Sequence, residues 1–139
     1  MPYHLHPTGH SHLPGLTALS VVAALALFSG PVVAHDAACN VTSAVFTGHI
    51  EPRHCDTGQY TGKSKFISAY CTGVTAAQSF CGMVQNHAGV TRTVQGDGRV
   101  RYDANLGLTV GRDGEQCGRV IINSTTDGTV VTQFPEMSC

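Results

Sequence analysis

Apolar and polar side chains alternate in several short segments of the C-terminal half of the chain. In 99–103 charged residues alternate with apolar ones, and 106–110 repeats the same period of two. This period predicts strands that bury one face. Similar segments at 90–94, 119–123 and 129–134 extend the series, so the pattern predicts an antiparallel β-meander of about five strands.

Asp-Gly pairs separate these segments, at Asp97-Gly98, Asp113-Gly114 and Asp127-Gly128. Asp-Gly favours tight hairpins, because a type I′ turn requires positive φ at both central residues. The three pairs therefore support a meander in which neighbouring strands are joined by hairpins.

The N-terminal half predicts additional strands. Residues 42–50 include Phe46 and Ile50 on one side, and Pro52 would end this strand. Residues 64–71 are rich in aromatic and β-favouring side chains.

One helix is predicted at about 75–87, where apolar residues recur at three- and four-residue spacing. Thr75 and Gln78 would form a capping box, with Thr72 as the alternative N-cap. The apolar face would consist of Ala77, Phe80, Cys81 and Val84. The expected fold class is therefore α+β, with this helix packed on the sheet.

An uncharged apolar segment at 16–28 lies near the N-terminus, before the helix-breaking Gly30-Pro31. It is too short to span a bilayer and is typical of the apolar region of a signal peptide. Val32 and Ala34 supply the small residues that signal peptidase needs, so we expect cleavage after Ala34.

This cleavage predicts a signal peptide at 1–34 and a single disulfide-rich secreted domain at 35–139. The product would be extracellular, without stable membrane insertion. Because 1–34 contains no Lys or Arg, a membrane anchor is the alternative interpretation of this segment.

All six cysteines follow the expected cleavage site, and an even number in a short exported chain predicts three disulfides. A zinc site is the alternative, but the chain has no CxxC pair, so metal-ligand spacing is absent. Cys81 should point inward and tie the helix to the sheet, and Cys39–Cys139 is one pairing we expect. The six are Cys39, Cys55, Cys71, Cys81, Cys117 and Cys139.

Two N-glycosylation sequons begin at Asn40 and Asn123, and they agree with a secreted glycoprotein. Eight Lys or Arg residues against nine Asp or Glu leave the chain nearly neutral, which argues against a nucleic-acid partner attracted by overall charge. No nucleotide, calcium or zinc-protease motif is present, so no cofactor and no metal site are predicted.

The segment 49–54 holds the densest group of polar functional side chains: His49, Glu51, Arg53 and His54. Two imidazoles, a carboxylate and a guanidinium are the groups that a metal-independent secreted ribonuclease would use. The same residues also occur in an ordinary solvated loop, so catalysis is the alternative hypothesis.

Cleavage after Ala34 would make His35 the new N-terminus, where amine and imidazole can chelate copper together. This resembles copper-dependent polysaccharide monooxygenases and their non-catalytic relatives. The resemblance implies a second histidine ligand, for which His49, His54 and His87 are candidates.

The signal segment, the even number of cysteines and the final Cys139 together resemble small secreted cysteine-rich proteins of filamentous fungi, of the effector and killer-toxin type. The resemblance implies a virulence role through non-catalytic binding to a host or competitor protein, and we expect a monomer. The loop Asp56–Gly62 and the Asp-Gly turns would offer the contact surface.

Overall fold

The computed structural model of this protein describes residues 35–56 and 60–139, which belong to one compact unit. The expected signal peptide at 1–34 and most of its cleavage site lie outside the described residues. The final strand ends at Glu136, close to the C-terminal Cys139.

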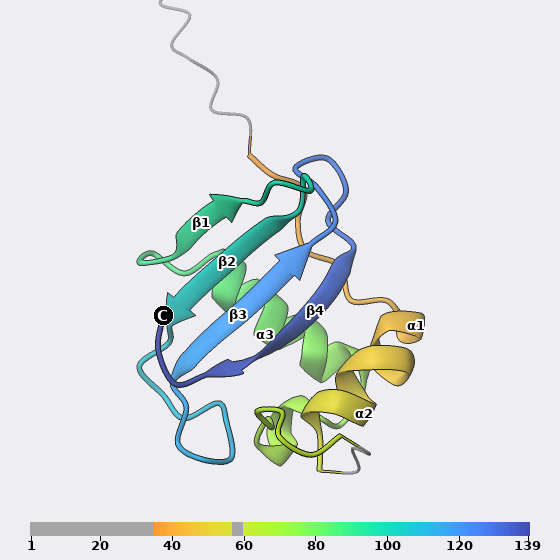
Figure 1. Ribbon diagram of the computed structural model, residues 1–139, viewed down its shortest axis with the longest axis vertical. Helices are drawn as coiled ribbons and strands as arrows, with labels where there is room; N and C mark the ends of the chain where they lie inside the picture. Colours follow the sequence, from red (N-terminus) through yellow and green to blue (C-terminus); the bar gives the residue numbers. More distant parts are fainter. Residues whose placement is uncertain (1–34, 57–59) are drawn as a thin grey trace, which may run out of the picture. The chain divides into compact units, whose positions relative to one another are not determined.

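Four antiparallel strands form one sheet in the order β1-β2-β3-β4 (Figure 1). They correspond to the strands predicted at 90–94, 99–103, 119–123 and 129–134, so the α+β class and most of the meander are confirmed. The strands are β1 (Thr91–Val94), β2 (Val100–Asn105), β3 (Cys117–Ile122) and β4 (Val130–Glu136).

The predicted strand at 106–110 does not form. Gly107 has φ of 68°, which turns the backbone in the middle of this segment. Leu108 is consequently exposed while Val110 is buried, and both lie in the connection between β2 and β3. Within 35–56 and 60–139, the sheet therefore has four strands and not five.

The segment predicted as a strand at 42–50 is helical. Thr42 begins it as an N-cap, and its Oγ1 accepts a hydrogen bond from Val45 N at 3.2 Å. Pro52 is tolerated because it lies in the first turn of the last of these helices. The three short helices are α1 (Ser43–Val45), the π-helix η1 (Phe46–Ile50) and α2 (Glu51–His54).

Residues 64–71 do not form the expected strand either. Phe66 makes one isolated antiparallel bridge, with Gly111, and the chain then enters the 3-10 helix η2 (Ser68–Tyr70). Across 35–56 and 60–139, every helix falls short of the length and apolar character needed to cross a membrane.

Helix α3 (Val74–Gln85) confirms the helix predicted at 75–87. Its N-cap is Gly73, which makes no side-chain capping bond, so the expected capping box is wrong. Gln78 is used elsewhere: its Oε1 accepts from Val41 N at 2.7 Å and its Nε2 donates to Cys39 O at 2.8 Å.

Gln85 repeats this contact two turns along α3. Its Oε1 accepts from Cys39 N at 2.7 Å, and its Nε2 donates to Ala37 O at 3.0 Å. Cys39 is also bonded to Cys81 of α3. The side chains of one helix face therefore hold the extended segment 37–41 as a strand partner would.

The apolar face of α3 covers one face of the sheet, as predicted. Its buried side chains Phe80 and Val84 lie over Gly118 of β3, where even a methyl group would come within 2.4 Å of Val84 Cγ2. Val120 and Ile122 continue the buried row along β3. Side chains between them, such as Arg119, point to the opposite, open face.

A β-bulge interrupts the pairing of β3 with β4. Ile121 pairs with Thr132 and Ile122 with Val130, which leaves Val131 without a partner. The bulge changes which side chains face α3. Gln133 is buried and donates to Ala77 O at 2.8 Å, whereas Phe134 lies on the open face.

Three disulfides use all six cysteines, as predicted, and they are Cys39–Cys81, Cys55–Cys71 and Cys117–Cys139. The expected pairing Cys39–Cys139 is wrong, because Cys39 lies beside α3 and the C-terminus lies beside β3. Cys81 does anchor α3, but it does so to the N-terminal segment. Cys139 is tied to the sheet through Cys117.

Gly118→Ala should lower the free energy of unfolding by about 1 to 3 kcal/mol, because the added methyl group overlaps Val84 and Phe80. Gly96→Ala is the matched control, since nothing lies within 4 Å of its Cβ position. Urea unfolding of both variants tests the packing, and equal stabilities would contradict the described contact between α3 and β3.

Candidate functional site

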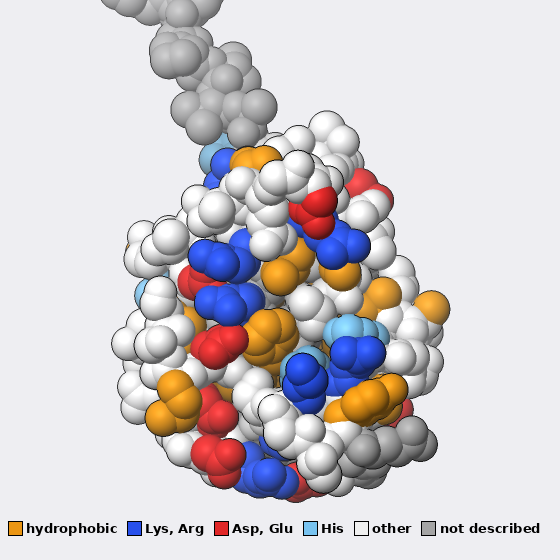
Figure 2. All heavy atoms as spheres, viewed as in Figure 1, with side chains coloured by type: hydrophobic (Ala, Val, Ile, Leu, Met, Phe, Trp, Pro, Cys, Tyr) orange, Lys and Arg blue, Asp and Glu red, His pale blue; other side chains and the backbone are white. Residues whose placement is uncertain are grey.

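A pocket of about 520 Å³ lies on the open face, between the short helices and β4. Figure 2 views this face and shows basic and histidine side chains gathered there. Residues 62–64 close one side of the pocket. We call it the histidine pocket, and its two walls are His49, Arg53 and His54 from the helices and Thr132, Phe134 and Glu136 from β4.

The bulge in β4 creates one of these walls. Beyond Val131, every second residue of β4 faces away from α3, which places Thr132, Phe134 and Glu136 in a row on the open face. His49 Nε2 lies 3.0 Å from Thr132 Oγ1, and this contact joins η1 to β4.

His54 is buried between the helices and the sheet, with 5 % of its surface exposed. Its ring stacks on Phe134 with centroids 5.1 Å apart and planes 13° from parallel. Its Nδ1 lies 2.9 Å from Ser64 O. Because a carbonyl oxygen only accepts, Nδ1 carries the proton, and Nε2 of the neutral ring is left as an acceptor.

Both imidazoles of the pocket favour the neutral form. Burial lowers the pKa of His54 to about 4, and repulsion from His49, Lys65 and Arg53 adds to this effect. Burial, together with Arg53, also lowers the pKa of His49. At neutral pH the pocket therefore holds two uncharged rings 6.0 Å apart.

The positive charge of the pocket comes from Arg53 and Lys63. The Arg53 guanidinium lies over the ring of Tyr60, 4.8 Å from its centroid, and its backbone oxygen accepts from Lys65 Nζ at 2.7 Å. These contacts orient Arg53 without neutralising it.

The only carboxylate in the pocket wall formed by the described residues, Glu136, is already paired. Arg119 Nη1 donates to Glu136 Oε1 at 3.0 Å, and Arg119 Nε donates to Asp103 Oδ1 at 2.6 Å. Asp103 is 2 % exposed and also contacts Arg101 Nε at 2.8 Å, without the alignment of a hydrogen bond. A row of alternating charges thus crosses the open face from β2 to β4.

The structure brings together three of the four residues singled out in 49–54. His49, Arg53 and His54 line the histidine pocket, whereas Glu51 does not. Glu136 supplies a carboxylate instead, and sequence reasoning missed it. The spacing of Thr132, Phe134 and Glu136 shows that they share a strand face, but it could not show that this face is the open one.

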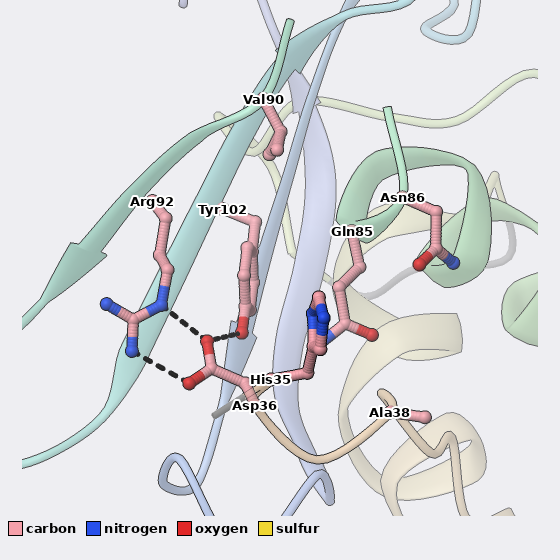
Figure 3. Close-up of a pocket in the computed structure, with 8 residues that line it drawn as sticks. All are labelled: His35, Asp36, Ala38, Gln85, Asn86, Val90, Arg92 and Tyr102. Atoms are coloured by element: carbon pink, nitrogen blue, oxygen red, sulfur yellow. Dashed lines mark hydrogen bonds and ion pairs between the residues drawn. The ribbon is translucent and has the colours of Figure 1, made fainter. Parts of the chain in front are cut away.

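His35 lies in a different pocket, of about 570 Å³, between the N-terminal segment, the end of α3 and β1–β2 (Figure 3). There Arg92 Nη2 donates to Asp36 Oδ1 at 2.7 Å, and the Tyr102 hydroxyl also donates to Asp36. Despite partial burial, Arg92 holds the pKa of Asp36 below its usual value.

The copper site considered for His35 stays a prediction. Of the candidate partners, His49 and His54 line the histidine pocket and not the pocket of His35. Among the described residues, no cluster of three His, Cys, Asp or Glu side chains could hold a metal ion.

The two sequons lie near one another in the fold. Asn40 is bridged to Thr129, and Asn123 N donates to Thr129 O at 2.9 Å. Both asparagines are exposed, although Asn123 Nδ2 also donates to Asp127 Oδ2 at 2.7 Å. Glycosylation at both sites stays a prediction.

Asp103→Asn should lower the free energy of unfolding by about 2 kcal/mol, because it leaves two guanidiniums without their shared carboxylate. The loss is smaller than for a fully buried pair, since Arg101 and Arg119 keep contact with solvent. Chemical denaturation measures the effect.

The control is Asp97→Asn, which keeps the turn acceptor and removes only an exposed ion pair of 3.6 Å with Arg99. It should cost less than about 1 kcal/mol. A loss at Asp97 equal to that at Asp103 would contradict a structural role for the charge row.

Comparison with known proteins yields no match to this chain among protein families, curated proteins or solved structures. No family assignment supports a function. The geometry of the histidine pocket is therefore the basis for a functional proposal.

Proposed function

We propose that this protein is a secreted recognition protein that binds an anionic ligand in the histidine pocket without catalysing a reaction. The observation that supports the proposal is the distribution of charge in this pocket. Among the described residues, no carboxylate pairs with Arg53 or Lys63, while Glu136 is paired with Arg119. An anion that enters the pocket therefore meets more positive than negative charge.

The shape of the site favours an anion that also carries a flat ring. Phe134 is occupied by the stacked His54 ring and by the Arg119 guanidinium, whose Cζ is 5.8 Å from its centroid. The aromatic face open to a ligand is that of Tyr60 at the rim, which is 42 % exposed and has Arg53 over its ring. Guanidinium and aromatic faces together suit a phosphate attached to a planar group. This local chemistry is the reason to consider phosphate-bearing ligands although the chain as a whole is nearly neutral.

The protonation of the pocket argues for binding over catalysis. Cleavage of a phosphodiester by acid–base chemistry requires one protonated and one unprotonated group. Both His49 and His54 have lowered pKa values, so neither is an effective proton donor at neutral pH. Glu136 is occupied by Arg119, which reduces its use as a base.

Secretion and recognition of a host or competitor molecule complete the proposal. Three disulfides are typical of small domains that fold in an oxidising compartment. The rim of the histidine pocket includes Tyr60 and residues 62–64, in and beside the loop expected to provide contact surface. The general layout of the chain, which resembles that of small secreted cysteine-rich fungal proteins, is the only further support for an effector-like role.

A second candidate function is a metal-independent ribonuclease, and one observation favours it. The bond from His54 Nδ1 to Ser64 O leaves Nε2 as the unprotonated nitrogen of a fixed ring. This is the state that a general base requires. His49, 6.0 Å away, would then have to supply the proton.

Binding can be tested by NMR titration with inorganic phosphate, adenosine monophosphate and a short single-stranded RNA. We expect shifts at Thr132 and Phe134 in the native protein. Arg53→Ala and Lys63→Ala should each weaken association about tenfold, as the loss of a charge-assisted hydrogen bond predicts. Arg99→Ala, which removes an exposed charge on the β1–β2 hairpin, should have little effect.

No shifts with any of the three ligands would reject anion recognition, as would equal weakening by Arg99→Ala. Incubation of RNA with the protein and a chelator between pH 5 and 8 separates the two functions. Intact RNA agrees with recognition. Cleavage that is lost in His54→Asn would establish the ribonuclease candidate instead.

A further inference from the structure

The histidine pocket depends on one contact between the short helices and the sheet. His54, at the end of α2, stacks on Phe134, and His49 of η1 lies 3.0 Å from Thr132 Oγ1. Both contacts reach β4 from η1 and α2, which follow one another directly in the helical segment 43–54. A helical segment of this length is marginally stable on its own, so its position depends on this packing.

Basic side chains surround His54. The neutral His49 of η1 and the cationic Arg53 of α2 face it from the helices, and Lys65 faces it from the segment that follows. Lys63 lies in the same pocket. Across the contact, Phe134 and Glu136 line the β4 wall, and Glu136 is paired with Arg119 of β3. A proton on His54 would therefore add charge to a buried ring whose nearest charged neighbours are mostly positive.

We propose that the contact between α2 and β4 is an acid-sensitive device: when His54 gains a proton, the helical segment Phe46–His54 separates from β4 and the histidine pocket opens, while the sheet stays folded. The inference concerns the site of the proposed function. It does not depend on any ligand being bound there.

Covalent and backbone links limit the opening to one side of the molecule. The disulfide Cys55–Cys71 holds the end of α2, and Phe66 N donates to His54 O at 2.8 Å. The sheet and α3 contact each other directly, where Phe80 and Val84 lie over Gly118. Phe46 and Ile50 of η1 belong to the same buried cluster, so the opening has to expose them, while the direct contact between α3 and the sheet stays in place.

The direction of the pH effect follows from burial. The pKa of His54 is lowered from 6.5 to about 4 in the folded state, so the closed contact is fully stabilised above the ordinary pKa. Its stability falls as the pH decreases from about 6.5 through 4, because the opened state then binds the proton more readily. This window lies within the range of acidified extracellular and vesicular environments.

Hydrogen exchange of the ligand-free protein, corrected for intrinsic rates, tests the proposal between pH 7 and pH 4. The equilibrium constant for opening of the helical segment should increase at least tenfold by pH 5 and on the order of 100-fold by pH 4, relative to pH 7. The amides of Phe46–Cys55, apart from Pro52, which has no N–H, report on this opening. Those of Val120 and Ile122 should stay protected and serve as an internal control.

Two variants remove the titrating ring in different ways. His54→Asn keeps a donor near Ser64 O, and His54→Phe keeps a ring on Phe134. Both should lose the pH dependence in Phe46–Cys55, whereas the control His87→Asn, outside the pocket, should retain it. An NMR titration of His54 in the native protein should give a midpoint near 4.

Three results would overturn the device: no increase in exchange of the native segment by pH 4, the same increase in both His54 variants, or a His54 midpoint of 6 or higher. If the device is present but no phosphate-bearing ligand binds, only the proposed function fails. If ligands bind and exchange is independent of pH, only the device fails.

Discussion

Helix α3 rests on the backbone of β3, because Gly118 has no side chain to hold the two apart. This close contact decides which face of the sheet becomes the core. Alternate residues of β2 and β3 are consequently directed to the other face, where Arg101, Asp103 and Arg119 form a row of charges. The short helices pack beside only one edge of that face, at β4, and the histidine pocket forms where they meet it (Figure 1).

Elements with a clear period could be predicted from the sequence. The helix at Val74–Gln85 and the four strands follow spacings of three to four and of two. The segment 42–50 failed because Phe46 and Ile50 fit both periods. His54 continues their four-residue spacing, and its burial shows that the helical period was the relevant one. Because His54 is polar, the apolar pattern of this segment ended at Ile50, and hydrophobicity alone did not indicate a helix.

The site was harder to predict than the fold, because it depends on one unpaired residue. Simple alternation through β4 from the buried Val130 would direct Phe134 into the core and Gln133 to solvent. The bulge at Val131 reverses both, placing a glutamine against α3 and an aromatic ring beside His54. Nothing local in the sequence marks the bulge. The histidines could therefore be recognised as candidates, while the wall opposite them could not.

Gln78 and Gln85 hold the segment 37–41 only through its backbone atoms. Bonds to backbone atoms do not depend on the side chains of the segment, so Ala37, Ala38 and Asn40 can be replaced at little cost to the stability of the fold. The two glutamines cannot, because few other side chains offer both a donor and an acceptor at that reach. In related chains, variation should therefore concentrate in the extended segment, while the amide pair on the helix is retained.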